Sequence, residues 1–181
     1  MKPWPVIDSR VIFEHPRLGI VEETVILPSG QQTGWLRIRD PRDSVCVICV
    51  DTDGRVLVAA QYNPPSRRVI GEFPGGGMEP GEAPPDAARR ELMEEVGLYP
   101  HRLRAIGAFL PDNRRSAARQ HVFVATDLEA RLLPGDESEF ITYEWLDPAT
   151  IARRIRSGDL ENGTFLAAWS LFSLSGGGEG R

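Results

Sequence analysis

The sequence predicts a layered α/β or α+β domain preceded by a small antiparallel β unit. Short apolar runs of strand length, separated by turn residues, recur along most of the chain, whereas only three segments have a helical pattern. Strands and helices do not alternate regularly, which argues against a doubly wound nucleotide-binding fold. The 181 residues suffice for one substantial core but not for two ordinary domains. The expected parts are residues 1–40 (β unit), 41–174 (main domain) and 175–181 (flexible tail).

The strands of the β unit come first in the chain. The Pro28-Ser29-Gly30 turn allows the run before it and the run after it to pair in antiparallel fashion. The predicted strands are residues 10–13, 20–27 and 35–38.

The main domain begins with two apolar strands, and its central helix follows a glycine-rich stretch. The first two strands are joined by residues 51–54, Asp-Thr-Asp-Gly, which predict a tight hairpin. The glycine-rich stretch covers residues 71–81, and Gly97 can end the helix after it as a left-handed cap. The predicted strands are residues 45–50, 55–61, 105–110, 121–126 and 140–145. The predicted helices are residues 85–96, 148–155 and 164–174.

The composition is typical of a globular protein and argues against a membrane protein or a nucleic-acid-binding protein. Hydrophobic residues make up 41% and charged residues 26% of the chain, and no apolar run is long enough to cross a bilayer. The first residues lack the apolar stretch of a secretory signal, so we expect a soluble, cytoplasmic protein without a membrane partner. A net charge of −5 argues against a nucleic-acid partner.

Acidic residues gather in one window. Residues 72–97 contain seven carboxylates and two arginines and so carry the entire net charge of −5. The window is either a solvated acidic face or a metal site, because crowded carboxylates repel one another unless solvent or a cation offsets their charge.

The helix predicted within this window favours the metal site. Glu91, Glu94 and Glu95 lie at i, i+3 and i+4 and therefore share one helix face. Hard oxygen ligands select Mg²⁺ or Mn²⁺ over softer metals. Arg90 can pair with Glu94 at i+4, and the preceding glycines let the backbone approach the ions closely enough to offer a carbonyl ligand.

These residues belong to a longer pattern that resembles the signature of the Nudix hydrolases. The pattern is Gly76, five residues, Glu82, seven residues, then Arg90-Glu91-Leu92-Met93-Glu94-Glu95-Val96-Gly97-Leu98, and it matches at every defined position. The resemblance implies an α/β/α sandwich with a mixed sheet that hydrolyses nucleoside diphosphates linked to another group. It implies Gly75, Glu91, Glu94 and Glu95 as metal ligands, and Glu82 and Arg90 as the residues that orient them, with Glu94 also counted as catalytic.

The flanking residues are similar to the ADP-ribose and nucleotide-sugar pyrophosphatase branch of this family. They are residues 61–65 (Gln-Tyr-Asn-Pro-Pro), residues 72–76 (Glu-Phe-Pro-Gly-Gly) and Pro111. The β unit resembles the extra domain that this branch uses to form homodimers and to cap the partner's active site. Asn63 departs from the branch, where many relatives have an arginine that contacts substrate, and this leaves the substrate's identity open.

Four residues are candidates for substrate binding. Trp35 occupies the place of an aromatic residue that stacks on adenine in some members of the branch, the alternative being ordinary core or interface packing. Arg39 could reach a phosphate, and Arg114 or Arg115 could clamp a phosphate or a sugar phosphate. For all three arginines the alternative is a solvated surface residue.

The loop at residues 135–140 resembles the segment that supplies a mobile general base in this branch. Glu139 is the preferred base, with Glu137 as an alternative, since a carboxylate near bound cations can accept the proton of the attacking water. The alternative is a simple surface loop.

Cys46 and Cys49 are expected to pack in the core from opposite faces of a strand. The three histidines, His15, His101 and His121, show no ligand spacing and receive no role.

The sequence therefore predicts a Mg²⁺-dependent enzyme, with Mn²⁺ able to substitute. It would cleave ADP-ribose or a related nucleoside diphosphate sugar into a nucleoside monophosphate and a sugar phosphate. One alternative keeps the enzyme but changes the substrate to nucleoside triphosphates, dinucleoside polyphosphates or capped RNA. The other is a module that senses nucleotides without catalysis.

Overall fold

The chain forms two compact units in a computed structural model, which describes residues 2–135 and 140–176. The N-terminal unit contains Met1–Arg42 together with Leu110–Ala118, and the main unit contains Asp43–Phe109 and Arg119–Arg181. Within the described residues, no helix is both long and apolar enough to span a membrane.

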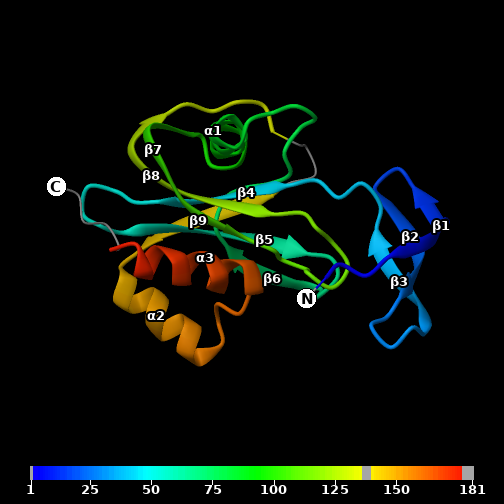
Figure 1. Cartoon of the computed structure of the whole chain (residues 1–181). Helices are drawn as coiled ribbons and strands as arrows, with labels where there is room; N and C mark the ends of the chain where they lie inside the picture. Colours follow the sequence, from blue (N-terminus) through cyan, green and yellow to red (C-terminus); the bar gives the residue numbers. More distant parts are fainter. Residues whose placement is uncertain (1, 136–139, 177–181) are drawn as a thin grey trace. The chain divides into compact units, whose positions relative to one another are not determined.

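The N-terminal unit is a three-stranded antiparallel sheet in the order β1 (Val6–His15), β2 (Leu18–Ile26), β3 (Gln32–Ile38), coloured blue in Figure 1. This confirms the predicted antiparallel strands. Gly30, with φ 86°, supplies the left-handed residue of the turn between β2 and β3. The segment Leu110–Ala118 joins this unit through a hydrogen bond of 2.7 Å from the Ile38 N–H to the Arg115 carbonyl.

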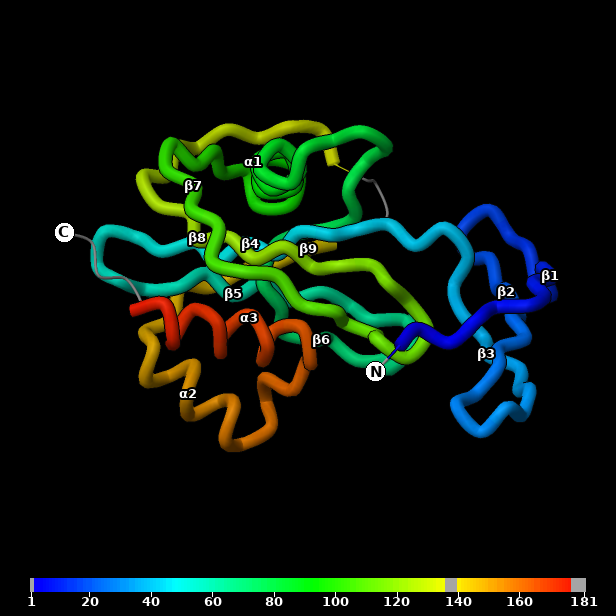
Figure 2. The backbone as a smooth tube through the Cα atoms, viewed as in Figure 1, coloured from blue at the N-terminus to red at the C-terminus, as the bar shows by residue number. Residues whose placement is uncertain are grey.

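The main unit has two three-stranded sheets between helices. The first sheet is mixed, because its central strand β8 pairs in parallel with β4 and antiparallel with β7. The second sheet is antiparallel, with β5 between β6 and β9. Figures 1 and 2 show α1 on one side of the strands and α2 and α3 on the other. The elements are β4 (Ser44–Cys49), β5 (Val56–Asn63), β6 (Arg68–Glu72), α1 (Pro84–Glu95), β7 (Leu98–Phe109), β8 (Gln120–Ala130), β9 (Ile141–Leu146), α2 (Pro148–Ser157) and α3 (Gly163–Leu174).

The core lies on both faces of these sheets. Alternate side chains of β4 point to opposite faces, as expected of a strand. Val45, Val47 and Cys49 belong to the cluster that contains the buried face of α1, whereas Cys46 and Ile48 pack with residues of α2 and α3. The three layers are therefore held together by strands that are apolar on both faces.

Helix α1 forms and ends largely as the sequence predicts. Ala88 and Leu92 are fully buried and Val96 nearly so, which confirms the predicted apolar stripe. Gly97 follows the helix with φ 66° and confirms the left-handed cap.

The predicted hairpin between the first two strands of the main unit is wrong in one respect. The turn forms, with Gly54 at φ 78° and a hydrogen bond from the Asp51 N–H to the Arg55 carbonyl. Beyond the isolated bridge Val50–Val56, however, β4 and β5 part into different sheets. The apolar character of both strands reflects burial against helices rather than pairing with each other.

The end of β6 is fixed by aromatic packing against α3. The rings of Phe73 and Phe165 stack with centroids 4.1 Å apart, and both residues are buried. Phe73 is two residues before Gly75, so this stack anchors the start of the glycine-rich loop in the core.

Candidate active site

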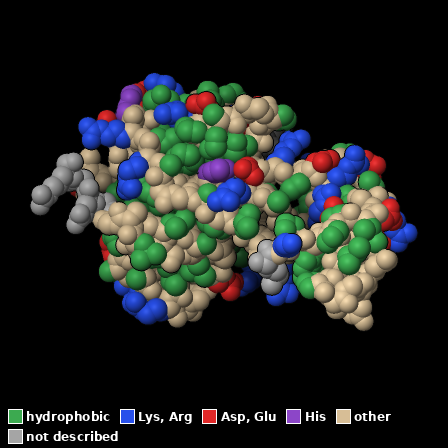
Figure 3. Space-filling view, viewed as in Figure 1, with side chains coloured by type: hydrophobic (Ala, Val, Ile, Leu, Met, Phe, Trp, Pro, Cys, Tyr) green, Lys and Arg blue, Asp and Glu red, His purple; other side chains and the backbone are tan. Residues whose placement is uncertain are grey.

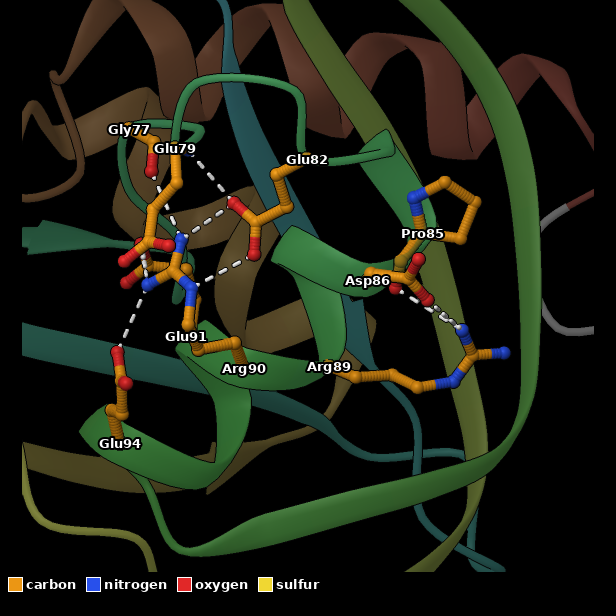
Figure 4. A network of polar contacts seen from close by, with 9 residues as sticks. All are labelled: Gly77, Glu79, Glu82, Pro85, Asp86, Arg89, Arg90, Glu91 and Glu94. Carbon is orange, nitrogen blue, oxygen red and sulfur yellow. Dashed lines mark hydrogen bonds and ion pairs between the residues drawn. The ribbon is translucent and has the colours of Figure 1, made fainter.

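Arg90 is the centre of a polar network on α1 (Figure 4). Its guanidinium contacts the Glu82 carboxylate through two hydrogen bonds of 2.9 and 3.0 Å. It also donates to Glu91 at 2.8 Å and to Glu94 at 3.0 Å. A fifth hydrogen bond, of 3.1 Å, reaches the Gly77 carbonyl. One half-buried cation therefore holds three carboxylates and the glycine-rich loop together.

The protonation states within this network follow from its contacts. Hydrogen bonds from Arg90 lower the pKa of Glu82, and the Glu79 backbone N–H adds to this at 2.8 Å. The Glu82 carboxylate in turn raises the pKa of Arg90 above its already high value. Both groups are therefore charged at neutral pH, and the pairing predicted between Arg90 and Glu94 is confirmed as part of a larger cluster.

At Gly75 and Gly76 the glycine-rich loop passes so close to α1 and to β4 that a side chain does not fit. The Gly75 N–H donates to the Glu95 carboxylate at 2.8 Å. A Cβ on Gly75 would lie 2.2 Å from the Val45 carbonyl oxygen, and one on Gly76 would lie 2.6 Å from the Glu91 carboxylate. The loop backbone therefore lies against the acidic face of α1, as the close approach predicted for these glycines requires.

The donor set suits a hard divalent cation. Glu91, Glu94 and Glu95 share one helix face, and Glu91 is only 8% exposed although it is acidic. As they stand, no three His, Cys, Asp or Glu side chains within the described ranges are arranged to hold one metal ion together. Glu91 and Glu94 instead face Arg90.

A small cavity of about 280 Å³ lies beside the acidic face, lined by Glu94, Glu95, Leu132, Leu133, Pro134, Gly135 and Ile141. The segment that forms one side of this cavity is joined to the end of α1 by two hydrogen bonds. The Arg131 N–H donates to the Gly97 carbonyl, and the Leu133 N–H donates to the Met93 carbonyl. This segment leads into residues 136–139. The predicted base Glu139 and its alternative Glu137 lie outside the described residues.

The substrate residues predicted from the sequence all belong to the N-terminal unit. The Trp35 ring is 46% exposed, contacts Trp4 edge to face, and donates its Nε1–H to the Arg114 carbonyl at 3.1 Å. Arg115 is exposed and lies 3.7 Å from Asp112. The structure therefore brings together Trp35, Arg114 and Arg115 through β3 and the segment 110–118.

Arg39 directly follows β3 in the N-terminal unit. Its guanidinium pairs with Glu14 at 2.8 Å and with Asp40 at 3.1 Å, and it lines an open groove of about 840 Å³. These carboxylates already neutralise its charge, which weakens its candidacy as a phosphate ligand.

The cysteines confirm the core packing predicted for them. Cys46 and Cys49 are both buried thiols, on opposite faces of β4. Burial raises the pKa of the Cys46 thiol to about 12 and raises that of Cys49 as well. Both therefore remain protonated and unreactive in the folded protein.

The contact between His121 and Asp43 was not predicted from the sequence. Its Nε2 lies 2.9 Å from the Asp43 carboxylate, next to the glycine-rich loop. The two residues are 78 positions apart in the chain and come together only through the parallel pairing of β4 with β8. A search for local ligand spacing has no signal for such a pair.

Comparison with known proteins decides the family. The NUDIX domain profile matches residues 40–168, well over half of the chain. The chain belongs to the Nudix family. It is a Nudix hydrolase, and members of this family generally require a divalent metal ion.

Individual relatives agree with this assignment. The chain is 34% identical to the ADP-ribose pyrophosphatase of Bacillus subtilis (strain 168) over 139 residues, 75% of this chain and 74% of that protein. It is 29% identical to the methanol dehydrogenase activator of Bacillus methanolicus over 137 residues, with the same coverage. The crystal structure of an ADP compounds hydrolase superposes with a TM-score of 0.89, covering 100% of this chain and 98% of the other at 21% identity. The expected Nudix fold is thus confirmed.

Proposed function

We propose that this Nudix hydrolase cleaves the diphosphate of ADP-ribose or of a related nucleoside diphosphate sugar. The products are a nucleoside monophosphate and a sugar phosphate, and the cofactor is Mg²⁺, with Mn²⁺ as a substitute. The observation that carries the proposal is the Arg90 cluster, which gathers Glu82, Glu91 and Glu94 against the glycine-rich loop. Similarity to an ADP-ribose pyrophosphatase over three quarters of the chain supports the substrate class.

The residues of α1 and of the glycine-rich loop would have separate roles in the reaction. Glu91, Glu94, Glu95 and the Gly75 carbonyl hold the cations, while Arg90 and Glu82 keep the carboxylates in place. Divalent cations held there would neutralise the diphosphate, activate water for in-line attack and stabilise the leaving oxygen. The Gly75 N–H restrains Glu95 in the orientation given by its 2.8 Å hydrogen bond, which limits the reorganisation needed at each turnover. Glu139, or Glu137, is proposed to take the proton of the attacking water.

The N-terminal unit would form a homodimer and recognise the rest of a substrate bound at the partner's active site. Trp35 is proposed to stack on the base, because its ring is exposed while its Nε1–H is satisfied by the Arg114 carbonyl. Arg114 and Arg115 would contact phosphate groups. Apolar side chains on the surface of this unit (Figure 3) support a dimer contact through β1. They include Val6, Ile7, Val11, Ile12 and Phe13, each about half exposed. Light scattering of the purified protein tests the dimer, and a monomeric mass at micromolar concentration would rule it out.

We also propose that the protein is cytoplasmic. Cys46 and Cys49 are buried free thiols on opposite faces of β4, where they cannot bridge each other, and free thiols are compatible with a reducing compartment.

The first test is a substrate panel with Mg²⁺ and then with Mn²⁺. It contains ADP-ribose, ADP-glucose, GDP-mannose, NADH, a diadenosine polyphosphate and nucleoside triphosphates. Preference for ADP-ribose or another nucleoside diphosphate sugar is expected. Preference for triphosphates would be compatible with α1 as the metal-binding helix but would refute the proposed substrate class.

The second test is Glu95→Gln, which keeps an oxygen to accept the Gly75 N–H but removes the charge. We expect kcat to fall at least about 100-fold at saturating Mg²⁺, because a metal ligand contributes several kcal/mol to the transition state. The matched control is Glu79→Gln, an exposed glutamate in the same loop whose side chain lies outside the proposed ligand set. Near-normal turnover of Glu95→Gln would refute the ligand assignment.

A further inference from the structure

Asp43, which directly precedes β4, is fixed by contacts from two directions. One carboxylate oxygen lies 2.9 Å from His121 Nε2, and the other accepts the Arg119 backbone N–H at 2.9 Å. These two hydrogen bonds lower the pKa of Asp43, so its carboxylate is charged near neutral pH. The side chains of Asp43 and His121 are only about a third and a quarter exposed, which shields the contact from water.

The backbone of the same residue holds the glycine-rich loop. The Asp43 carbonyl accepts the Met78 N–H at 2.9 Å, and Ser44 forms an isolated antiparallel bridge with Gly77. The Gly77 carbonyl accepts the Arg90 guanidinium at 3.1 Å. Three consecutive contacts therefore connect the imidazole of His121 with the centre of the acidic cluster.

We infer that Asp43 and His121 are positioning residues for the cation-binding carboxylates of α1. His121 fixes Asp43, Asp43 fixes the loop at Met78, and the loop fixes Arg90 through the Gly77 carbonyl. If this support loosens, Arg90 loses its only backbone acceptor within the described residues. Glu91 and Glu94 then lose the orientation that Arg90 gives them.

The pair is not required simply to join β4 to β8. Those strands share six paired positions, from Ser44–Gln120 to Cys49–Ala125, and most of the paired side chains are buried. A purely structural role would therefore affect unfolding, whereas a positioning role affects the loop and cation binding in the folded protein. The metal part of this inference rests on the proposed function, but the effect on the loop does not.

The first measurement needs no metal. Backbone hydrogen exchange is followed for the Gly75–Glu79 loop in the wild-type protein and in His121→Ala. We expect the Met78 amide to exchange at least about tenfold faster in the variant, and His121→Gln, which keeps a donor, to recover most of the protection. His101→Ala is the matched control, because it removes a second histidine–carboxylate pair, His101–Glu129 at 2.8 Å, between neighbouring strands. Equal loop protection in wild type and His121→Ala would overturn the inference.

The second measurement is direct titration of the substrate-free protein with Mn²⁺ by calorimetry. We expect the dissociation constant to rise about tenfold in His121→Ala and in Asp43→Ala, with His101→Ala unchanged. With ADP-ribose at saturating Mn²⁺, KM should stay within about twofold. Wild-type Mn²⁺ affinity in folded His121→Ala and Asp43→Ala would overturn the positioning role. Failure of the wild-type protein itself to bind Mn²⁺ would overturn the proposed metal site instead, while the exchange result continues to test the loop.

Discussion

Replacing Gly76 with alanine should disturb the carboxylate of Glu91 without disturbing the backbone. A Cβ at Gly76 would lie 2.6 Å from one carboxylate oxygen of Glu91 and 2.7 Å from the other. Gly76 does not adopt a left-handed conformation, so alanine is compatible with its backbone. The clash therefore falls on the end of a side chain that Arg90 holds at 2.8 Å.

The size of the effect follows from these distances. Ordinary van der Waals contact begins at 3.4 Å, so the carboxylate must retreat by about 0.8 Å. A misplacement of about 1 Å at a catalytic group costs on the order of 100-fold in rate. We expect kcat of Gly76→Ala to fall by about that factor and the Mg²⁺ requirement to rise. The unfolding midpoint should change little, because the end of a glutamate side chain moves more easily than backbone.

Two neighbouring glycines serve as controls in the same assay of ADP-ribose hydrolysis against Mg²⁺ concentration. Gly77 has open space around its Cβ position, so Gly77→Ala should keep nearly full activity. Gly75 has φ 148° and faces the Val45 carbonyl at 2.2 Å, so Gly75→Ala should lose folded stability as well as activity. Wild-type turnover and Mg²⁺ dependence in Gly76→Ala would refute the assignment of Glu91 as a ligand. An equal loss of activity in Gly77→Ala would also refute this assignment.

Two further results are expected. Trp35→Ala should raise KM for ADP-ribose roughly tenfold and leave kcat within about twofold, because one base-stacking contact is lost. Trp35→Phe should recover most of the affinity. An unchanged KM in Trp35→Ala would exclude base stacking. Glu82 has a lowered pKa in the folded protein, so it contributes stability that is present above its ordinary value of 4.5 and is lost as the pH falls through the lowered value. The difference in unfolding free energy between wild type and Glu82→Gln, measured by denaturation, should therefore shrink on acidification, and a constant difference from pH 7 to pH 3 would contradict the pairing with Arg90.

The parts of the site that local sequence can specify were predictable. The spacing of Glu91, Glu94 and Glu95 places them on one face of any helix. Leu92 lies on the adjoining apolar face, which is expected to be buried when the helix packs on a sheet. Gly97 marks the helix end for a similarly local reason. Helix α1 therefore begins and ends within one residue of the prediction.

The parts that depend on contacts between distant segments were not predictable in the same way. Strands β4 and β5 follow each other through a turn yet enter different sheets, and an apolar run carries no information about which neighbour it will pair with. The short strand β6, residues Arg68–Glu72, has only two large apolar residues and therefore gave no signal. Asp43 and His121 look like two unrelated polar residues until β4 and β8 pair in parallel.

The N-terminal unit is assembled from two stretches of the chain. In the sequence these stretches are separated by β4, β5, β6, α1 and β7 of the main unit. A single cut near residue 42 would remove the sheet but leave Leu110–Ala118 behind, without the Ile38 N–H and the Trp35 indole that its carbonyls accept. Unlike an appended module, this unit would not be transferred whole by an exchange of the first forty residues alone. A chimaera made by that exchange would combine a sheet from one protein with the segment Leu110–Ala118 of another.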